Sequence, residues 1–488
     1  MSLLLERFLA RGEDARTAVI DDSGEHSYAS LVRRARGVAA ALGDVSGDRV
    51  AVLALPGVDF LASFYGALLA GRALIVLTPI HPAAELRYYC EDAGVGTVVA
   101  SASLAKLAPP LDVRDVSALA AYEPAPLPPI AAGAPALQLY TSGTTGKPKG
   151  AVLTHANLAI QQELVGAAWG FRESDVLLHS LPLHHMHGLA IALLTAIGAG
   201  ATARMLRSFD AVAIWNEMAR ATVFMGVPSM YHRLFAAFDA ADDATRARWS
   251  ANARQLRLAT SGSAALPVTL AERWRAVNGK IPLERFGMTE IGVGITNPLD
   301  GPRHAGHVGQ PLPTVETRIV DDEGEDADTG ELWIRGPSVF VGYHQKEAET
   351  ARAFVAASDG GTPWFRTGDT VMREPSLEGR PFKILGRTSV DILKSGGYKL
   401  SALEIEEVLR RHPDVDDVAV VGVPDEAWGE RVVACVQAHR ACEAEALRAF
   451  VKEHLAPYKV PKQVLFFDAL PRNALGKVVK PDLVKQLV

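Results

Sequence analysis

The chain has 488 residues, 48% of them hydrophobic and 22% charged, with a formal net charge of -6. Such a length exceeds one ordinary hydrophobic core, so we expect two or more folding units in a globular protein. The mild negative charge, without long blocks of one sign, excludes nucleic acid and anionic membranes as predicted partners. Any anionic ligand must therefore be held by local groups.

Cysteine usage and the apolar runs bear on the compartment. The three cysteines, Cys90, Cys435 and Cys442, have no metal-binding spacing, and their odd number argues against a disulfide framework. The opening leucines are soon followed by Glu6, unlike the uninterrupted apolar stretch of a signal peptide. The most apolar uncharged run, 188–203, is too short for a bilayer. We therefore predict a cytoplasmic protein without a membrane span.

Short apolar runs alternate with helical patterns through the first half of the chain. The runs typical of buried strands are 49–55, 74–77, 97–100, 137–140 and 222–226, and helical spacing covers 60–70 and 211–221. This alternation predicts α/β layers with largely parallel sheets. A Pro/Ala-rich passage at 123–135 is interpreted as a connection between subdomains.

The pattern changes in the second half. Shorter alternating segments begin near Thr314 and predict an antiparallel sheet or small β-barrel-like part. After Arg387 the chain reads as a small α+β unit, with helices near 403–411 and 443–455 and strands at 418–421, 431–438 and 463–467. We predict a large N-terminal domain of layered α/β subdomains at 1–387 and a small mobile C-terminal domain at 388–488.

The segment with the clearest chemistry is LYTSGTTGKPKG at 139–150, which follows a predicted strand. Glycines let backbone N–H groups converge on an anion, hydroxyls donate further hydrogen bonds, and lysines supply charge, so the segment suits phosphate. It is not a Walker A loop, because Pro148 stands where that loop has a magnesium-binding hydroxyl. Composition alone also allows a flexible polar turn.

The stretch YTSGTTGKPKGAVLTH resembles the signature of the adenylate-forming superfamily, which includes acyl-CoA synthetases, peptide-synthetase adenylation domains and firefly luciferase. Further segments match in chain order: SGSAALP at 261–267, RFGMTE at 285–290, GEL at 330–332, RTGD at 366–369, GR at 386–387, KSGGYK at 394–399 and PRNALGK at 471–477. The resemblance implies an enzyme that joins a carboxylic acid to AMP, using ATP and Mg²⁺, and then transfers the acyl group to coenzyme A.

The resemblance also implies an ATP site. Its residues are Thr141, Ser142, Gly143, Thr144, Thr145, Gly146, Lys147 and Lys149 at the triphosphate, Ser263, Ala264, Glu284, Arg285, Phe286, Gly287 and Met288 at the nucleotide, and Asp369 and Arg387 at the ribose. Phe286 replaces the usual tyrosine, so adenine stacking can survive while the hydroxyl's hydrogen bond cannot. A turn aspartate and a surface arginine are the alternatives for Asp369 and Arg387.

Four residues are implied to take part in catalysis. Thr289 would contact the α-phosphate, Glu290 would hold magnesium, Lys477 would reach the substrate carboxylate and the α-phosphate, and His185 would gate the site. An ordinary helix N-cap is the alternative for Thr289 and Glu290, and a solvated lysine is the alternative for Lys477. Because Lys477 lies in the small domain, domain motion is expected.

The implied coenzyme A site is the loop Lys394, Ser395, Gly396, Gly397 and Tyr398, where absent side chains admit a narrow thiol arm. In the family the small domain rotates to present this loop after adenylation. The hinge is expected near 387–391. Its residues 388–390 are one longer than in many relatives, which leaves the pivot residue open.

The expected acid pocket contains Arg233 and Arg285, with His187, Met186 and Ser261. These passages resemble malonyl-CoA synthetases, and an arginine could pair the second carboxylate of malonate or methylmalonate. Arg233 could instead lie on the outer face of a helix, Arg285 could pair with Glu284, and His187 could be packed core.

The sequence therefore predicts an ATP-dependent malonyl-CoA, or methylmalonyl-CoA, synthetase. A monocarboxylate-CoA synthetase and a catalytically inactive nucleotide-binding or scaffold protein are the alternatives. A carrier-protein thiol could also replace coenzyme A as the acceptor. The sequence predicts no particular oligomeric state.

Overall fold

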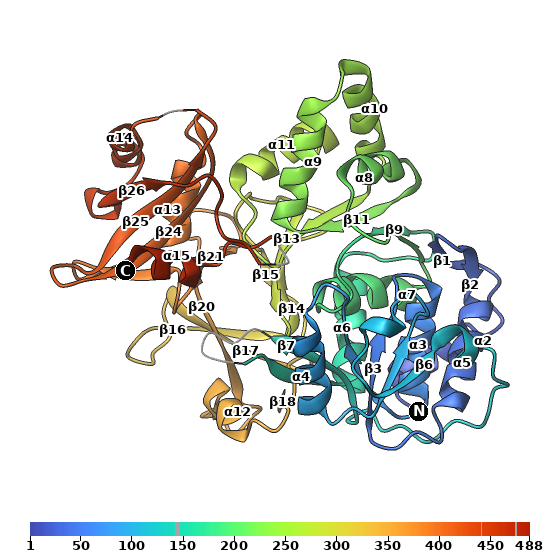
Figure 1. Ribbon diagram of the computed structural model, residues 1–488. Helices are drawn as coiled ribbons and strands as arrows, with labels where there is room; N and C mark the ends of the chain where they lie inside the picture. The colour runs from blue at the N-terminus through green and yellow to red at the C-terminus, as the bar shows by residue number, and fades with distance from the viewer. Residues whose placement is uncertain (142–146, 441, 474–475) are drawn as a thin grey trace.

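The computed structural model describes residues 1–141, 147–440, 442–473 and 476–488. A large N-terminal part carries a smaller C-terminal part on one side (Figure 1). This mixed α/β architecture confirms the predicted fold class. None of the helices in the described ranges combines the length and apolar character that a bilayer crossing requires.

The first sheet has seven strands in the order β18-β8-β7-β4-β3-β5-β6. These are β18 (Gly342–Tyr343), β8 (Lys149–Thr154), β7 (Pro135–Thr141), β4 (Ala73–Val76), β3 (Arg49–Leu53), β5 (Thr97–Ala100) and β6 (Asp112–Asp115). The five strands from β7 to β6 run parallel, and the β7–β8 hairpin and β18 are antiparallel additions. The predicted strand at 97–100 coincides with β5, because a continuous apolar run fits a strand buried on both faces.

The second sheet has nine strands in the order β15-β14-β13-β12-β11-β9-β10-β1-β2. These are β15 (Gln310–Pro311), β14 (Gly292–Thr296), β13 (Leu283–Met288), β12 (Leu258–Ser261), β11 (Val223–Gly226), β9 (Val176–His179), β10 (Thr202–Met205), β1 (Thr17–Asp21) and β2 (Gly24–Ser27). Its central strands are parallel, so their carboxyl ends meet at one edge, the usual place for ligands in such sheets.

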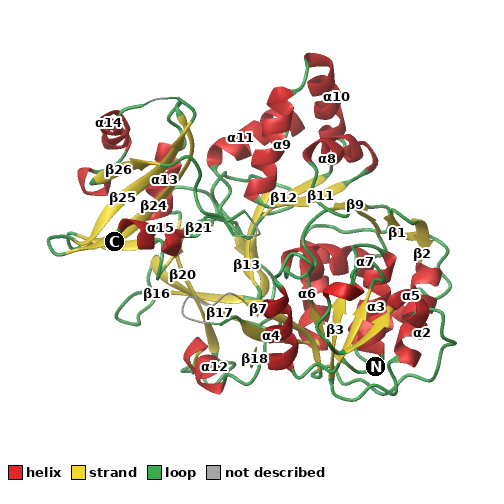
Figure 2. Cartoon of the chain, viewed as in Figure 1, coloured by secondary structure: helices red, strands yellow, loops and turns green. Residues whose placement is uncertain are grey.

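Helices cover both sheets. They are α1 (Leu3–Leu9), α2 (Tyr28–Ala41), α3 (Val58–Leu69), α4 (Ala83–Ala93), α5 (Val116–Leu119), α6 (His155–Ala168), α7 (Thr195–Ala199), α8 (Ala211–Glu217), α9 (Pro228–Ala240), α10 (Asp243–Arg254), α11 (Val268–Asn278) and α12 (Glu347–Ala353). Helices α8 to α11 gather beside β11 and β12 (Figure 2). There the buried Trp215, Trp249 and Trp274 form a core of stacked rings.

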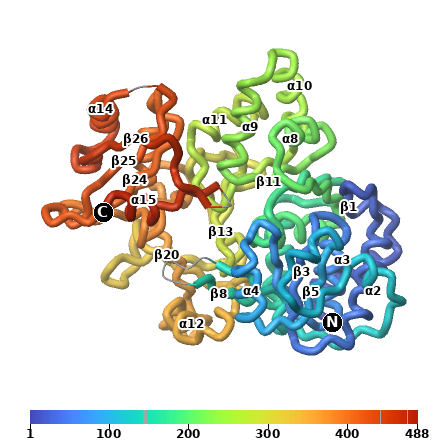
Figure 3. Tube along the Cα trace, in the orientation of Figure 1, coloured from blue at the N-terminus to red at the C-terminus, as the bar shows by residue number. Residues whose placement is uncertain are grey.

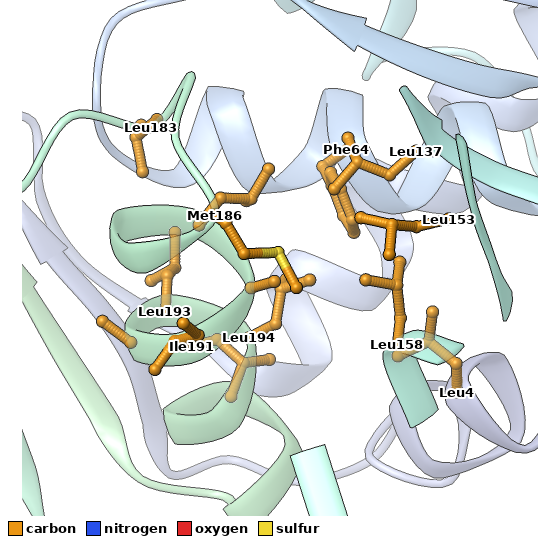
Figure 4. Packing of buried hydrophobic residues seen from close by; sticks show 14 of the residues in the cluster. Leu4, Phe64, Leu137, Leu153, Leu158, Leu183, Met186, Ile191, Leu193 and Leu194 are labelled. Carbon is orange, nitrogen blue, oxygen red and sulfur yellow. The ribbon is translucent and has the colours of Figure 1, made fainter. Parts of the chain in front are cut away.

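The main hydrophobic core joins the two sheets through residues of α1, α3, α6, β7 and β8 (Figure 4). A π-helix, His187–Leu194, contributes Ile191, Leu193 and Leu194 to this core. The sequence reveals only a continuous apolar run here, so the π-helical turn was not predicted. Because π-turns often occur at functional sites, the start of this helix at His187 is a candidate part of the site.

The remaining sheets are mainly antiparallel. The five-stranded sheet that precedes the small domain contains β16 (Glu316–Val320), β17 (Thr329–Arg335), β20 (Trp364–Arg373), β19 (Phe354–Val355) and β21 (Phe382–Arg387). The C-terminal domain contains β22 (Ile392–Ser395), β23 (Tyr398–Ser401), α13 (Ala402–Leu409), β24 (Val415–Asp425), β25 (Gly429–Ala438), α14 (Ala444–His454), β26 (Gln463–Phe466) and α15 (Lys480–Leu487). Short 3-10 turns occur at Ala105–Leu107, Met218–Arg220 and Pro457–Lys459.

Candidate active site

Two lysines lie where the chain enters β8 of the β7–β8 hairpin. Thr141 pairs in register with Lys149, and the predicted phosphate residues Ser142, Gly143, Thr144, Thr145 and Gly146 lie outside the described residues. The ammonium of Lys147 lies 5.2 Å from the ring centroid of Tyr88, and that of Lys149 lies 5.0 Å from the centroid of Tyr343. Both cations are thus held beside aromatic faces next to the predicted loop.

Thr289 and Glu290 occupy the tight turn between β13 and β14, so the helix N-cap alternative is wrong. Glu290 is 4% exposed, and its Oε1 accepts a hydrogen bond from Tyr343 Oη at 2.8 Å. Burial raises the pKa of this carboxyl, while the Tyr343 hydrogen bond and the charge of Arg387 oppose the rise. Because Tyr343 also faces Lys149, one tyrosine links the hairpin to the buried carboxylate.

Tyr343 was not predicted from the sequence. It lies on the two-residue strand β18, which pairs with β8 at the edge of the first sheet. Burial and the nearby Glu290 raise the pKa of its phenol, so the hydroxyl stays protonated and donates. The only available signal was a Gly-Tyr pair in an irregular stretch, which does not indicate a site.

Asp369 and Arg387 face each other on adjacent strands. They pair in register across β20 and β21, and Arg387 Nη1 lies 3.2 Å from Asp369 Oδ1. Burial raises the pKa of Asp369, and the charges of Arg387 and Lys477 oppose this rise. Arg387 and Asp369 also act on the pKa of Glu290, so the structure brings these predicted nucleotide residues into one cluster.

Lys477 approaches this cluster from the C-terminal domain. Figure 3 shows the last part of the chain passing from the small domain toward β13. The backbone N–H of Lys477 donates to Asn473 Oδ1 at 3.0 Å. A Cβ added at Gly476 would lie 3.0 Å from Ser229 Oγ, so the loop sits against the start of α9. The positive field of Lys477 therefore reaches Asp369 although the two lie in different domains.

Arg285 is a buried cation with unused donors. Its side chain lies on β13, the residue is 4% exposed, and Nε and Nη2 have no hydrogen-bond partner among the described residues. Burial lowers the pKa of the guanidinium to about 10, so it remains charged at neutral pH. An ideal Cβ at Gly262 would lie only 2.5 Å from Arg285 Nε, so glycine leaves the room that the guanidinium occupies.

His187 lies between Ser263, which it contacts, and the charge of Arg285, which acts on its pKa. His187 Nδ1 lies 3.2 Å from Ser263 Oγ, and its buried Nε2 has no partner among the described residues. Burial lowers the pKa of His187 far below its usual value, and the charge of Arg285 lowers it further. Ser261, at the carboxyl end of β12, also has a buried hydroxyl without a described partner. The neutral imidazole of His187, the hydroxyl of Ser261 and the guanidinium of Arg285 are therefore three buried polar groups in this part of the second sheet.

Glu284 and Arg285 do not form the ion pair that the sequence left open. Successive side chains of a strand point to opposite faces, and Glu284 Oε1 accepts from Gly306 N at 2.9 Å on the other side. Burial raises the pKa of Glu284 to about 8, while hydrogen bonds from Gly306 and Leu266 oppose the rise and the charge of Glu407 adds to it. Arg285 is thus left without the carboxylate of its neighbour.

The structure corrects the prediction for Arg233. This side chain is exposed on the outer face of α9, where its guanidinium lies 4.5 Å from the ring centroid of Phe209. Met230 and Leu234 face the interior instead. Arg233 is therefore not brought together with Arg285, and the outer-face alternative holds.

Met186 also lies elsewhere than predicted. It is 5% exposed, and its side chain points into the main core among Leu153 and Leu158 (Figure 4). Its predicted place in the acid pocket is corrected to a packing position. Phe286 also belongs to this core, on the strand that carries Arg285.

The remaining predicted residues take several positions. Gly287 and Met288 end β13, whereas Ser263 and Ala264 are exposed in the turn after β12. His185 lies 4.0 Å from His184 between ring centroids, and burial lowers its pKa to about 4. Its imidazole is therefore neutral at physiological pH.

The predicted coenzyme A loop forms the tip of the β22–β23 hairpin. Tyr398 is 53% exposed and stacks on Tyr458 with ring centroids 4.4 Å apart, while Gly396 packs against Trp428. Lys394 is exposed and Ser395 is buried. The hydrogen bond from Lys399 and the charge of Lys394 lower the pKa of Asp322 in the large domain, and among the described residues no contact joins this tip to the Glu290–Asp369 cluster.

These features together define an adenylate-forming enzyme. They are the layered α/β domain, the hairpin suited to phosphate, the buried acidic turn and the lysine supplied by a second domain. The chain belongs to the AMP-binding enzyme family. The family model for the AMP-binding enzyme matches residues 5–344, and that for the AMP-binding enzyme C-terminal domain matches residues 404–477.

Similar proteins agree over nearly the whole chain. The mitochondrial malonate–CoA ligase ACSF3 of Mus musculus is 40% identical, over 99% of this chain and 90% of that ligase. The ATP-bound crystal structure of MatB from Rhodopseudomonas palustris superimposes with a TM-score of 0.89 at 34% identity, covering 100% of this chain and 99% of MatB. A malonyl-CoA ligase ternary product complex with methylmalonyl-CoA and AMP gives 0.71 at 36% identity, covering 97% and 100%.

Proposed function

We propose that this protein is an ATP-dependent malonate–CoA ligase. It converts malonate, ATP and CoA into malonyl-CoA, AMP and pyrophosphate. Methylmalonate is the proposed second substrate. The observation that carries this proposal is the buried Arg285, with its unpartnered Nε and Nη2. The similarity to the ligases named above supports the same conclusion.

The acid is selected by its second carboxylate. A buried carboxylate without a partner is costly, whereas a guanidinium can hold it with two parallel hydrogen bonds. Arg285 retains its charge at neutral pH, and His187 and Ser263 offer neutral polar groups beside it. A monocarboxylate with an apolar tail would leave these donors unpaired, so the pocket favours a short dicarboxylate.

The first half-reaction joins the acid to AMP. An oxygen of the reacting carboxylate attacks the α-phosphorus of ATP, the bond to the β-phosphate breaks, and pyrophosphate leaves. In this proposal Lys477 and Thr289 contact the reacting carboxylate and the α-phosphate, where charge builds up. Lys147 and Lys149 hold the triphosphate, and Asp369 accepts hydrogen bonds from the ribose hydroxyls.

Magnesium fits the site as a companion of ATP. Glu290 supplies a buried carboxylate oxygen, and the described residues contain no group of three or more histidines, cysteines or carboxylates that could hold a metal alone. Mg²⁺ commonly binds through one or two carboxylates together with substrate phosphates. When bound, it would neutralise phosphate charge. The carboxylate that we assign to it is Glu290.

The second half-reaction requires another arrangement of the domains. The thiolate of CoA attacks the carbonyl carbon of the acyl-adenylate, and AMP leaves. Most of the loop Lys394–Tyr398, which we propose binds the thiol arm, is exposed in this structure, while the charge of Lys477 opposes the rise that burial causes in the pKa of Asp369. The TM-score is lower against the product complex than against ATP-bound MatB, although the sequence identities are similar. This difference supports a rotation of the small domain between the two steps.

The proposal is tested by pyrophosphate release with ATP and a panel of acids: malonate, methylmalonate, succinate and octanoate. Malonate should give the highest kcat/KM, and octanoate turnover without malonate turnover would overturn the assignment. Lys477→Ala should abolish most of the adenylation while ATP binding remains measurable. Unchanged turnover in that variant would show that the lysine is misassigned.

We also propose that the protein acts in the cytoplasm. The three cysteines are free thiols in the structure, as a reducing compartment requires. Fractionation of the native cells tests this location, and recovery of the protein in a membrane-bounded compartment would contradict it.

A further inference from the structure

Lys480 is a buried cation that the proposed chemistry does not use. It opens α15, three residues after Lys477, and is 8% exposed. Its Nζ lies 2.5 Å from Asp391 Oδ1 and 2.7 Å from Glu406 Oε1. Burial lowers the pKa of the ammonium, but the two carboxylates outweigh this effect and raise it above its ordinary value. Because buried ion pairs are costly to desolvate, stability alone explains this group poorly.

One end of this arrangement lies at the hinge. Asp391 Oδ2 accepts from Arg387 N at 3.0 Å, and Asp391 N donates to Arg387 O at 2.7 Å. The carbonyl of Asp391 accepts from Ala402 N at 2.8 Å, which ties it to the small domain. Arg387 belongs to the large domain through its pairing with Asp369. The turn at 388–390 thus lies between Arg387, which is fixed to the large domain, and Asp391, which is fixed to the small domain.

The other end reaches the loop of Lys477. Glu406 Oε2 lies 3.2 Å from Arg410 Nη2, and Arg410 Nε lies 3.5 Å from Asp417 Oδ1. Asp417 also pairs with Arg472, whose Nη1 donates to Gly476 O at 2.5 Å. Charges of alternating sign therefore run from Asp391 through Lys480 to Arg472, whose guanidinium binds the carbonyl of the residue before Lys477.

We propose that Lys480 is a positioning residue for the adenylation step. It joins the hinge end at Asp391 to the ion chain that holds Gly476, so that the hinge and the loop of Lys477 move as one unit. The side chain touches no substrate and acts only through its two carboxylate partners. This inference rests on the proposed ATP-dependent ligase function.

Measuring the two half-reactions separately distinguishes a positioning role of Lys480 from a role in folding. Lys480→Met keeps the length of the side chain and removes its charge. Malonate-dependent exchange of pyrophosphate into ATP, which needs Lys477, should fall roughly a hundredfold. Thioester formation from prepared malonyl-AMP and CoA does not need Lys477 at the phosphate and should stay close to that of the unaltered enzyme. Lys480→Arg should recover part of the exchange activity.

Equal losses in both half-reactions, or unchanged exchange, would overturn the proposal. Lys485→Met is the matched control, because Lys485 is exposed on the same helix and should affect neither step. If Lys480→Met does not fold, Arg472→Met tests the same chain from its more exposed end, and it should lower exchange selectively. An unaltered protein without malonate-dependent exchange would instead contradict the proposed function.

Discussion

At the residue scale, two neighbouring side chains on one strand are both buried but differ in charge and in hydrogen-bond partners. Arg285 is buried with its charge and two unpaired donors, while Glu284 points to the other face and is buried among backbone donors and Glu407. The strand is covered on both faces, so the sequence could not tell which side chain faces a ligand. Arg285 thus has a charge available for the proposed substrate, whereas the raised pKa of Glu284 favours its protonated form at neutral pH.

The importance of the position of the Arg285 guanidinium can be tested by a substitution that leaves its charge in place. Gly262→Ala would bring a methyl group to about the position 2.5 Å from Arg285 Nε, so the guanidinium must shift. We expect KM for malonate to rise roughly tenfold, since a displaced bidentate partner loses on the order of 1–2 kcal/mol. KM for ATP should change little. An unaltered malonate KM, measured by pyrophosphate release, would contradict this geometry.

Glu284 predicts a pH dependence of stability. Its pKa in the folded state is about 8, above the ordinary value of 4.5, so the folded protein holds a proton that the unfolded chain releases. The stabilisation is complete below pH 4.5 and is lost as pH rises through about 8. Glu284→Gln should therefore gain Tm relative to the unaltered protein on going from pH 5 to pH 9. A constant Tm difference across this range would contradict the prediction.

At the element scale, periodicity predicted several strands, including β5 and β11, whereas the family resemblance misplaced the side chain of Arg233. The helix that carries Arg233 is α9, and its inward residues are Met230, Tyr231, Leu234 and Phe235. At about 100° per residue, position 233 falls well away from that inward face. The helical pattern thus contained the information that places Arg233 outside, although the family resemblance suggested the pocket.

Other features could not be read from the sequence. The π-helix at His187–Leu194 lies inside a continuous apolar run, whose lack of periodicity gives no sign of whether the helix is α or π. Tyr343 reaches Glu290 only because the short strand β18 pairs with β8 across a separation of about two hundred residues in the chain. Local patterns contain no information on such a long-range contact, whereas the ordered motifs predicted the cluster of Glu290, Asp369 and Arg387.

The start of the π-helix depends on Gly188. A Cβ at this position would lie 2.3 Å from the carbonyl oxygen of Pro182, which is backbone and cannot swing away. Gly188→Ala should therefore lower the free energy of unfolding by about 1–3 kcal/mol, the usual range for overpacking. Denaturant unfolding of this variant, with Gly198→Ala as a comparison against the flexible side chain of Gln162, measures the effect. Equal stability of both variants would argue against a fixed backbone contact.

At the scale of the whole molecule, the structure has the arrangement that suits adenylation. The loop of Lys477 docks beside α9, and Glu407 of the small domain accepts a hydrogen bond from Val268 N at 3.2 Å. Lys399 also pairs with Asp322 across the domains. The predicted thiol loop remains largely exposed in this arrangement, so we expect the second step to require a change in domain orientation.

A reversible link between the domains tests this requirement. Asp322 and Lys399 are both exposed, so cysteines at these positions, in a Cys442→Ser background, can be joined by a cleavable bis-maleimide. The linked protein should keep malonate-dependent pyrophosphate exchange and lose malonyl-CoA formation. Cleaving the link should restore it, with the unlinked double variant as control. Full malonyl-CoA formation by the linked protein would contradict the domain rotation.

The role of Arg285 as the partner of the second carboxylate is tested most directly by comparing kcat/KM for malonate in Arg285→Met and Arg233→Met. Losing a buried charged partner should cost about 2–4 kcal/mol, so Arg285→Met should fall roughly 30- to 1,000-fold. Arg233→Met, which alters an arginine on the protein surface, should remain close to the unaltered enzyme. Equal kcat/KM values in the two variants, or a loss confined to Arg233→Met, would contradict the account.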